Sequence, residues 1–207
     1  MESLQARIET AHEITATIFN GIQDDWWNSP TPCTEWDVRQ LANHLVGGYR
    51  LFHAAIQGTG TPMDFDADWL GADPLTEYKS AAADVVSAWK EPVVLERTLT
   101  ISVGPVPGHL AALIHLTEVT VHGIDLAVAT AQEQCIDEDA AEDLLSTMQQ
   151  MGVMEQFRVP GIFEPERSAP AGAPPHKRLM AFLGRTADFS PAVPRSLSPR
   201  PENHQHG

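Results

Sequence analysis

The most informative stretch of the chain is residues 115–125, which read His-Leu-Thr-Glu-Val-Thr-Val-His-Gly-Ile-Asp. Residues three and four apart on a helix lie on the same face, so Glu118 and His122 can converge on one point. At about 100° per residue, His115 and Asp125 fall on the same stripe, interleaved with small and aliphatic side chains. The pattern predicts a helix that turns four ionisable groups towards the core. Burying them costs several kcal/mol unless they are paired, hydrogen-bonded or bound to a cation.

A second helical stretch, residues 36–48, carries a histidine on its inward face. His44 recurs there with apolar side chains at helical spacing. Together with Glu118 and His122 it could supply two imidazoles and one carboxylate to a divalent metal. Three protein ligands leave a fourth position open, which is the arrangement of catalytic zinc. This donor set suits zinc best, and it also accepts Ni or Fe(II).

Spacing alone leaves other interpretations open. A Glu-x-x-x-His pair is also common on a solvated helix face, and a histidine such as His44 is often a core residue bonded to a backbone carbonyl. His115 and Asp125 lie about one turn on either side of the pair, so they are candidates to fix an imidazole tautomer or to move protons in catalysis. His115 is also an alternative metal ligand.

The charge balance limits the partners. The 207 residues include 13 Lys and Arg against 28 Asp and Glu, which gives a formal net charge of −15. No basic run interrupts this excess, which argues against nucleic acid or an anionic membrane as a partner. A small-molecule substrate is the expected partner, and a homodimer is left open.

The cysteines and the N-terminus indicate the compartment. Cys33 and Cys135 are the only cysteines, too few for a disulfide framework, so a reduced pair in a reducing compartment is the simplest interpretation. For Cys33, just before a helix start, a small buried residue is favoured over a reactive thiolate. The chain has no 18-residue apolar run and no signal-peptide pattern. We expect a cytoplasmic protein.

The chain reads as helices with one small β interruption. Thr34 is expected to cap the second helix, with Asp37 in capping-box position. Residues 93–103 alternate like a strand, and Gly104-Pro105 is expected to turn it back as a hairpin. Helices are predicted over about residues 3–20, 34–58, 74–90, 107–131, 137–151 and 176–185.

These elements predict an all-α, up-and-down helical bundle. The bundle domain is expected over residues 1–186, followed by a disordered proline-containing tail over 187–207. The loops at residues 30–33 and 58–73 are expected to border the mouth of the metal pocket, because loops often carry functional sites.

Three stretches together carry a family resemblance. They are residues 30–48 (Pro-Thr-Pro-Cys-Thr-Glu-Trp-Asp-Val-Arg-Gln-Leu-Ala-Asn-His-Leu-Val-Gly-Gly), 118–127 (Glu-Val-Thr-Val-His-Gly-Ile-Asp-Leu-Ala) and 179–185 (Leu-Met-Ala-Phe-Leu-Gly-Arg). The chain resembles the mycothiol-dependent maleylpyruvate isomerase metal-binding family of the DinB-like superfamily. The resemblance implies a DinB-like four-helix bundle, here with a short β-hairpin insertion and an extra C-terminal helix. It also implies a divalent metal, usually zinc, held by His44, Glu118 and His122.

The resemblance further implies that a low-molecular-weight thiol, mycothiol or a similar one, is a cosubstrate. The two-domain isomerases of the family append a C-terminal domain, whereas little sequence follows the bundle here, so we expect a single-domain member. Its expected activity is thiol S-transfer to a small electrophile, or isomerisation of one, with the metal favouring the thiolate.

Two other function classes are compatible with the sequence. One is a non-catalytic module of the same fold that binds metal and a small ligand or docks a partner protein. The other is a purely structural bundle, whose polar stripe is satisfied by internal hydrogen bonds and buried water.

Overall fold

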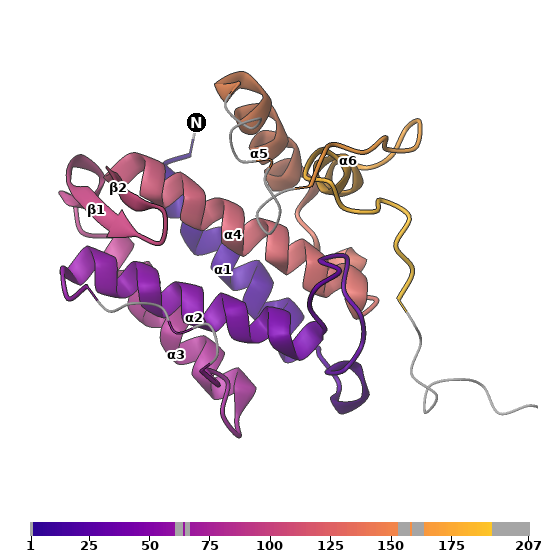
Figure 1. Ribbon diagram of the computed structural model, residues 1–207, viewed down its shortest axis with the longest axis horizontal. Coiled ribbons are helices and arrows are strands. Elements are labelled where there is room, and N and C mark those ends of the chain that lie inside the picture. Colours follow the sequence, from indigo (N-terminus) through magenta and orange to yellow (C-terminus); the bar gives the residue numbers. More distant parts are fainter. Residues whose placement is uncertain (1, 61–63, 65–66, 153–157, 159–163, 192–207) are drawn as a thin grey trace, which may run out of the picture.

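The computed structural model describes residues 2–60, 64, 67–152, 158 and 164–191 (Figure 1). Its centre is a bundle of four helices in which α1 and α2 each pack against both α3 and α4. The expected all-α bundle with a small two-stranded sheet is confirmed. The four helices are α1 (Leu4–Asn20), α2 (Val38–Gln57), α3 (Pro74–Trp89) and α4 (Gly108–Ala129).

Local sequence signals define the starts of α2 and α3. The Asp37 carboxylate accepts the Gln40 N–H at 2.8 Å, and the Gln40 side chain accepts the Asp37 N–H at 3.0 Å, which is a complete capping box. The expected cap at Thr34 is therefore wrong by three residues. Helix α3 begins at residue 74, as predicted. Asp73 caps it and Pro74 lies in its first turn, where a missing N–H costs nothing.

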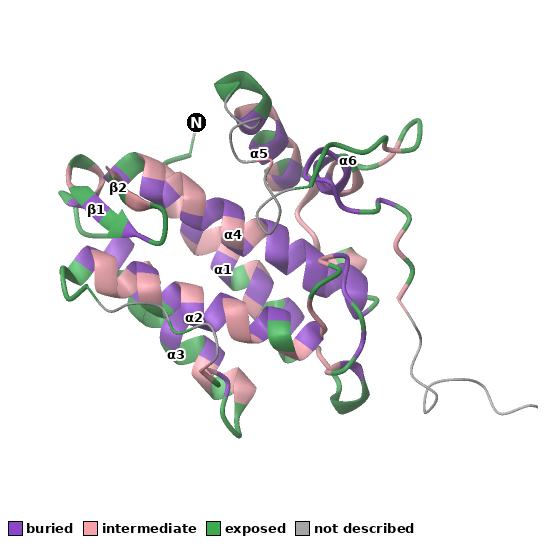
Figure 2. Cartoon of the chain, viewed as in Figure 1, coloured by how far each residue is buried: buried purple, intermediate pink, exposed green. Residues whose placement is uncertain are grey.

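Helix α4 is the central element of the fold. Residues 121–130 are all buried (Figure 2), because other helices cover this half of α4 on more than one side. Among the described residues, α4 is the one helix with the length and apolar composition to cross a membrane, yet 72% of its most apolar window is buried inside the protein. A helix that is apolar all round and covered in this way is a core helix.

The β interruption forms a short antiparallel hairpin of β1 (Thr98–Ile101) and β2 (Gly104–Pro107). Its register pairs Ile101 with Gly104, so residues 102–103 form the turn. The expected turn at Gly104-Pro105 is wrong by two residues, since both belong to β2. The first part of the expected strand is also wrong, because Val94–Glu96 forms a 3₁₀ turn.

Helices α5 (Glu138–Met151) and α6 (Pro175–Phe182) form a second layer beside α4 (Figure 1). Residues of α4, α5 and α6 share an apolar cluster that includes Val121, Ile124, Val128, Leu144, Leu145 and Leu179. The fifth helix therefore packs outside the four-helix bundle. Of the predicted disordered tail, residues 192–207 lie outside the described residues, so the domain boundary at 186 stays a prediction.

Candidate metal centre

Two helices bring the three predicted ligands together. His44 lies on α2, and Glu118 and His122 lie one turn apart on α4. The Nε2 atoms of His44 and His122 are 3.2 and 3.3 Å from Oε2 of Glu118. One ligand atom from each residue lies within 4.8 Å of the other two. Two imidazoles and one carboxylate fit a divalent ion such as zinc, which binds His nitrogen and Glu oxygen at about 2.0–2.2 Å.

Asp125 holds one of these imidazoles from behind. Its Oδ2 accepts a hydrogen bond from Nδ1 of His122 at 3.1 Å. A carboxylate in this position favours the neutral tautomer with its proton on Nδ1, which leaves the lone pair of Nε2, on the side of Glu118, free to bind a metal. Arg185, which follows α6, donates its Nε–H to both oxygens of the fully buried Asp125, at 2.8 and 2.9 Å. The buried negative charge is therefore paired.

The cluster sets the protonation of its members. Burial alone would raise the pKa of Glu118, but hydrogen bonds from His122 and His44 outweigh burial and hold this pKa below its usual value. Burial would lower the pKa of His122, but Asp125 and Glu118 raise it. Burial would likewise raise the pKa of Asp125, and Arg185 and His122 hold it lower. Glu118 is therefore ionised at neutral pH and can act only as an acceptor or a ligand.

The cluster lies in a pocket of about 400 Å³. The walls come from the loop before α2, the turn of the hairpin, α4 and the segment around the end of α6. The Trp36 ring lies 4.4 Å from that of His44 and 5.9 Å from that of His122, centroid to centroid. The indole therefore packs beside both imidazoles in the pocket wall.

The two loops expected at the pocket mouth differ in position. Pro32 and Cys33 line the pocket, as expected for the loop at 30–33. The described residues of the loop at 58–73 do not line it, so that expectation is wrong for them. The Asn43 side chain bonds this loop through the backbone of residues 67 and 69, on a neighbouring face of α2. The hairpin turn and the segment around α6 border the pocket instead.

Cys33 is half-buried in the pocket wall. Burial first, and then the charge of Asp125, raise the pKa of the Cys33 thiol to about 11. The side chain is therefore a thiol and not a thiolate at neutral pH. It agrees with the interpretation of Cys33 as a small, largely buried residue.

His115 lies apart from the cluster of His44, Glu118 and His122. It is fully buried, and its Nε2 is 2.9 Å from Nε2 of His12 on α1. Both rings pack against Tyr49, with centroids 4.4 Å away for His12 and 5.6 Å away for His115. Burial lowers the pKa of His12 to about 3 and that of His115 well below its usual value, so both imidazoles are neutral. The structure places His115 in a core pair, whereas Asp125 contacts His122, one of the three predicted ligands.

The sequence patterns assigned no role to Arg185 or His12. Arg185 comes from the second layer, far along the chain from Asp125, so helical spacing holds no sign of the pair. The one sequence feature that marks Arg185 is its position directly after the apolar stretch 179–184 in a chain with few basic residues. His12 has a local signal, because it lies four residues after Ile8 and three before Thr15, on the face of α1 that the structure buries.

A family model described as "Mycothiol maleylpyruvate isomerase N-terminal domain" matches residues 8–127. The chain belongs to this family. The matched segment contains His44, Glu118, His122 and Asp125, so the whole cluster except Arg185 lies within it.

Relatives of this family member cover nearly its full length. Two uncharacterized proteins of Mycobacterium tuberculosis, MT0763 and Rv0738, are each 32% identical to it over 187 residues, which is 90% of this chain and 99% of theirs. A crystal structure of the mycothiol-dependent maleylpyruvate isomerase has a TM-score of 0.62 at 16% identity, and covers 90% of this chain and 91% of that chain. The shared fold therefore extends beyond α4 into the second layer.

Proposed function

We propose that this protein is a divalent-metal-dependent enzyme that activates a low-molecular-weight thiol, mycothiol or a similar one. The activated thiol is either transferred to a small electrophilic substrate or used to isomerise that substrate. The observation that carries the proposal is the convergence of His44, Glu118 and His122 in a pocket large enough for a small molecule. Membership of the mycothiol maleylpyruvate isomerase family supports the thiol.

The donor set supports zinc first, with Ni or Fe(II) as alternatives, because imidazole suits all three and a carboxylate adds a hard oxygen. His44, Glu118 and His122 would hold the ion. When bound, it supplies the positive charge that lowers the pKa of a thiol and so favours the thiolate nucleophile.

The protein's own residues prepare this chemistry. Asp125 keeps Nε2 of His122 directed at the centre, and Arg185 keeps Asp125 ionised in the interior. Trp36 packs against both imidazoles and limits their movement. Without the ion, burial raises the pKa of the Cys33 thiol in the pocket wall. We assign the attacking sulfur to the substrate thiol, because the matched family is that of a mycothiol-dependent isomerase.

The test is an activity assay on the purified, metal-loaded protein. Mycothiol is supplied with maleylpyruvate, whose isomerisation is followed, and separately with small alkylating electrophiles, whose thiol adducts are counted. We expect turnover in at least one assay, loss of it on chelation and its return with zinc. His122→Ala should reduce turnover to background, whereas His109→Ala, an exposed histidine on α4, should leave it unchanged.

One outcome would favour a non-catalytic binding module instead of an enzyme. A protein that holds one metal per chain but accelerates no thiol reaction in either assay would be a metal-carrying binding module. Turnover that is indifferent to chelation and to His122→Ala would contradict the proposed role of the metal centre.

A further inference from the structure

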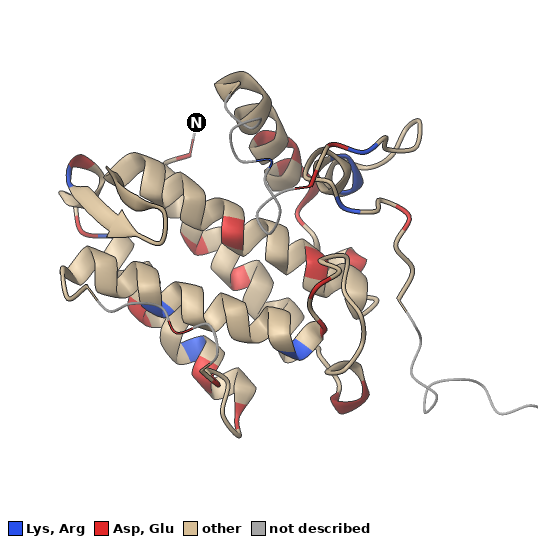
Figure 3. Ribbon diagram, viewed as in Figure 1, with Lys and Arg blue, Asp and Glu red and all other residues tan. Residues whose placement is uncertain are grey.

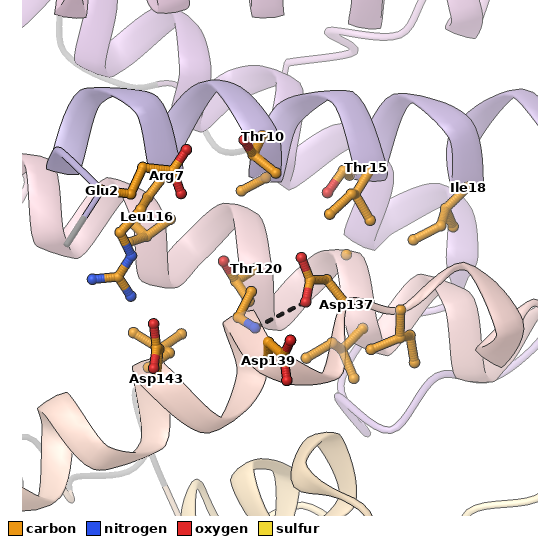
Figure 4. A pocket seen from close by; sticks show the side chains of 17 residues that line it. Glu2, Arg7, Thr10, Thr15, Ile18, Leu116, Thr120, Asp137, Asp139 and Asp143 are labelled. Atoms are coloured by element: carbon orange, nitrogen blue, oxygen red, sulfur yellow. Dashed lines mark hydrogen bonds between the residues drawn. The ribbon is translucent and has the colours of Figure 1, made fainter.

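A second cavity, of about 160 Å³, lies between α1, α4 and α5. It shares no residue with the metal pocket. Its α4 wall contains Leu116, Thr120 and Gly123, which at about 100° per residue lie on the opposite side of the helix from Glu118. Figure 4 shows Thr10 and Thr15 reaching in from α1, Thr120 from α4, and Asp139 and Asp143 from α5.

The cavity has an apolar interior. An engineered apolar cavity of about 150 Å³ is known to take up benzene, so this space accommodates one ring with a short substituent. Apolar ligands gain stability in proportion to the area that they remove from water. The apolar lining includes Ala11, Ile14, Ile18, Leu116, Ile124 and Leu144.

The rim of the cavity is acidic, and its acids differ from the others of α5. Glu138 and Glu142 pair with His176 and Arg178 of α6. Asp139 and Asp143 face the cavity instead, and no ion pair of theirs is found among the described residues. The dipole of α5 accounts for an acid in its first turn, at position 139, but not for Asp143 in the second.

The remaining polar groups leave this negative charge in excess. Arg7 is the one basic residue that lines the cavity among the described residues, and its guanidinium points towards the end of the cavity where Asp143 stands (Figure 4). The hydroxyls of Thr10 and Thr120 make no hydrogen bond within the described part of the chain and are available to a ligand. Basic side chains are few elsewhere too, and several lie at α6 and beside it (Figure 3).

We propose that this cavity binds a small organic cation, with an apolar body of about one aromatic ring in the interior and an ammonium group at the acidic rim. Asp139 and Asp143 provide the charge, and the hydroxyls of Thr10 and Thr120 accept hydrogen bonds from the ammonium group. The site is independent of the metal centre, so this proposal and the proposed thiol chemistry stand or fall separately.

Three probes of similar size test the charge of the ligand: 2-phenylethylammonium, 2-phenylethanol and 3-phenylpropionate. Binding to the full chain is followed by NMR shifts of the cavity-lining residues. We expect the ammonium to bind about fivefold more tightly than the alcohol, as for two partly solvated charge contacts, and the carboxylate to bind most weakly. Added salt should reduce the advantage of the ammonium.

Three variants locate the site. Asp139→Asn/Asp143→Asn should remove the preference for the cation and leave binding of the alcohol unchanged. Asp84→Asn/Glu91→Gln, which removes two exposed acids of α3 and the segment after it, is the matched control and should bind like the unaltered protein. Thr10→Phe should fill the cavity and abolish binding of all three probes.

Two results would overturn the proposal. Equal affinity for the ammonium and the alcohol would show that the acidic rim does not select a cation. Absence of binding by every probe, or binding that persists in Thr10→Phe, would show that no ligand site exists between α1 and α5.

Discussion

At the scale of single residues, Asp125 joins the cluster of His44, Glu118 and His122 to the second layer. Its carboxylate accepts hydrogen bonds from His122 on one side and from Arg185 on the other, and all of it is buried. A change at Asp125 therefore acts on both the orientation of a ligand and the pairing of a buried cation.

Asp125→Asn should weaken metal binding about 10- to 100-fold, the usual effect of losing the carboxylate behind a ligating histidine. It should also lower the free energy of unfolding by about 3–5 kcal/mol, because Arg185 stays buried without its charged partner. Competition with a chromophoric chelator measures the first effect, and urea unfolding measures the second. Metal affinity equal to that of Asp84→Asn, a distant exposed control, would contradict the role given to Asp125.

The His12–His115 pair predicts a pH dependence of stability. Both pKa values are lower in the folded state than the ordinary value of 6.5, that of His12 being about 3, so the unfolded chain binds more protons below pH 6.5. Stability should be complete above that pH and should fall as pH decreases towards 3, by up to about 1.4 kcal/mol per pH unit for each histidine. Urea unfolding at several pH values checks this.

His12→Leu/His115→Leu is the comparison for that experiment. It removes both titrating rings and leaves the other acid-sensitive groups in place, so its stability should depend less on pH between 6.5 and 4. If the free energy of unfolding depends on pH in the same way in both proteins, His12 and His115 are not neutral in the folded state.

The individual residues also show what local sequence can reveal. Glu118, His122 and Asp125 could be grouped in advance because one helix fixes their spacing. His44 could be added because a histidine among apolar residues at helical spacing is expected to face inward. The contact of Arg185 could not be predicted, since it depends on how α6 packs beside α4.

At the scale of elements, two residues are candidates to cap the N-terminus of α2, Asp37 and Thr34, and substitutions can distinguish them. Asp37→Ala should lower the free energy of unfolding by about 0.5–2 kcal/mol, because the N–H of Gln40 loses its acceptor. Thr34→Ala should have little effect, since Thr34 lies outside the helix. Chemical denaturation measures the free energy of unfolding of both variants. A larger decrease for Thr34→Ala than for Asp37→Ala would show that Thr34 is the cap.

The helical glycines give a second matched pair. A Cβ at Gly108 would lie 2.1 Å from the carbonyl oxygen of Val94, whereas a Cβ at Gly48 would have no neighbour within 4 Å. Gly108→Ala should therefore destabilise the protein, and Gly48→Ala should stabilise it by up to about 1 kcal/mol through better helix propensity. Thermal unfolding gives both signs. A stabilising Gly108→Ala would refute the close approach of α4 to the 3₁₀ turn at 94–96.

Elements are predictable to the extent that periodicity and caps define them. Asp73 and Pro74 are a local signal for the start of α3, and the predicted start at residue 74 is confirmed. The cap predicted at Thr34 is misplaced because Thr34 to Asp37 and Asp37 to Gln40 have the same spacing, and only the pairing of backbone N–H groups distinguishes them. The predicted hairpin turn is misplaced because Gly104-Pro105 fits a turn by composition, while strand register decides where the turn falls.

At the scale of the whole molecule, α4 serves two layers at once. One side of it joins the four-helix bundle, and another packs on α5 and α6, which carry Arg185 to the back of the metal centre. This arrangement explains why its apolar pattern is not confined to one stripe. Periodicity alone cannot show that a fifth helix leaves the bundle, because its inward face looks the same in either packing.

We propose that His44, Glu118 and His122 bind one divalent ion. The most direct test of this proposal is elemental analysis of the purified protein and of His44→Ala and His122→Ala, with His109→Ala as control. We predict close to one divalent metal per chain in the unaltered protein and the control, and almost none in the two ligand variants. Full metal content in both ligand variants, or none in the unaltered protein after incubation with zinc and removal of the excess, would contradict it.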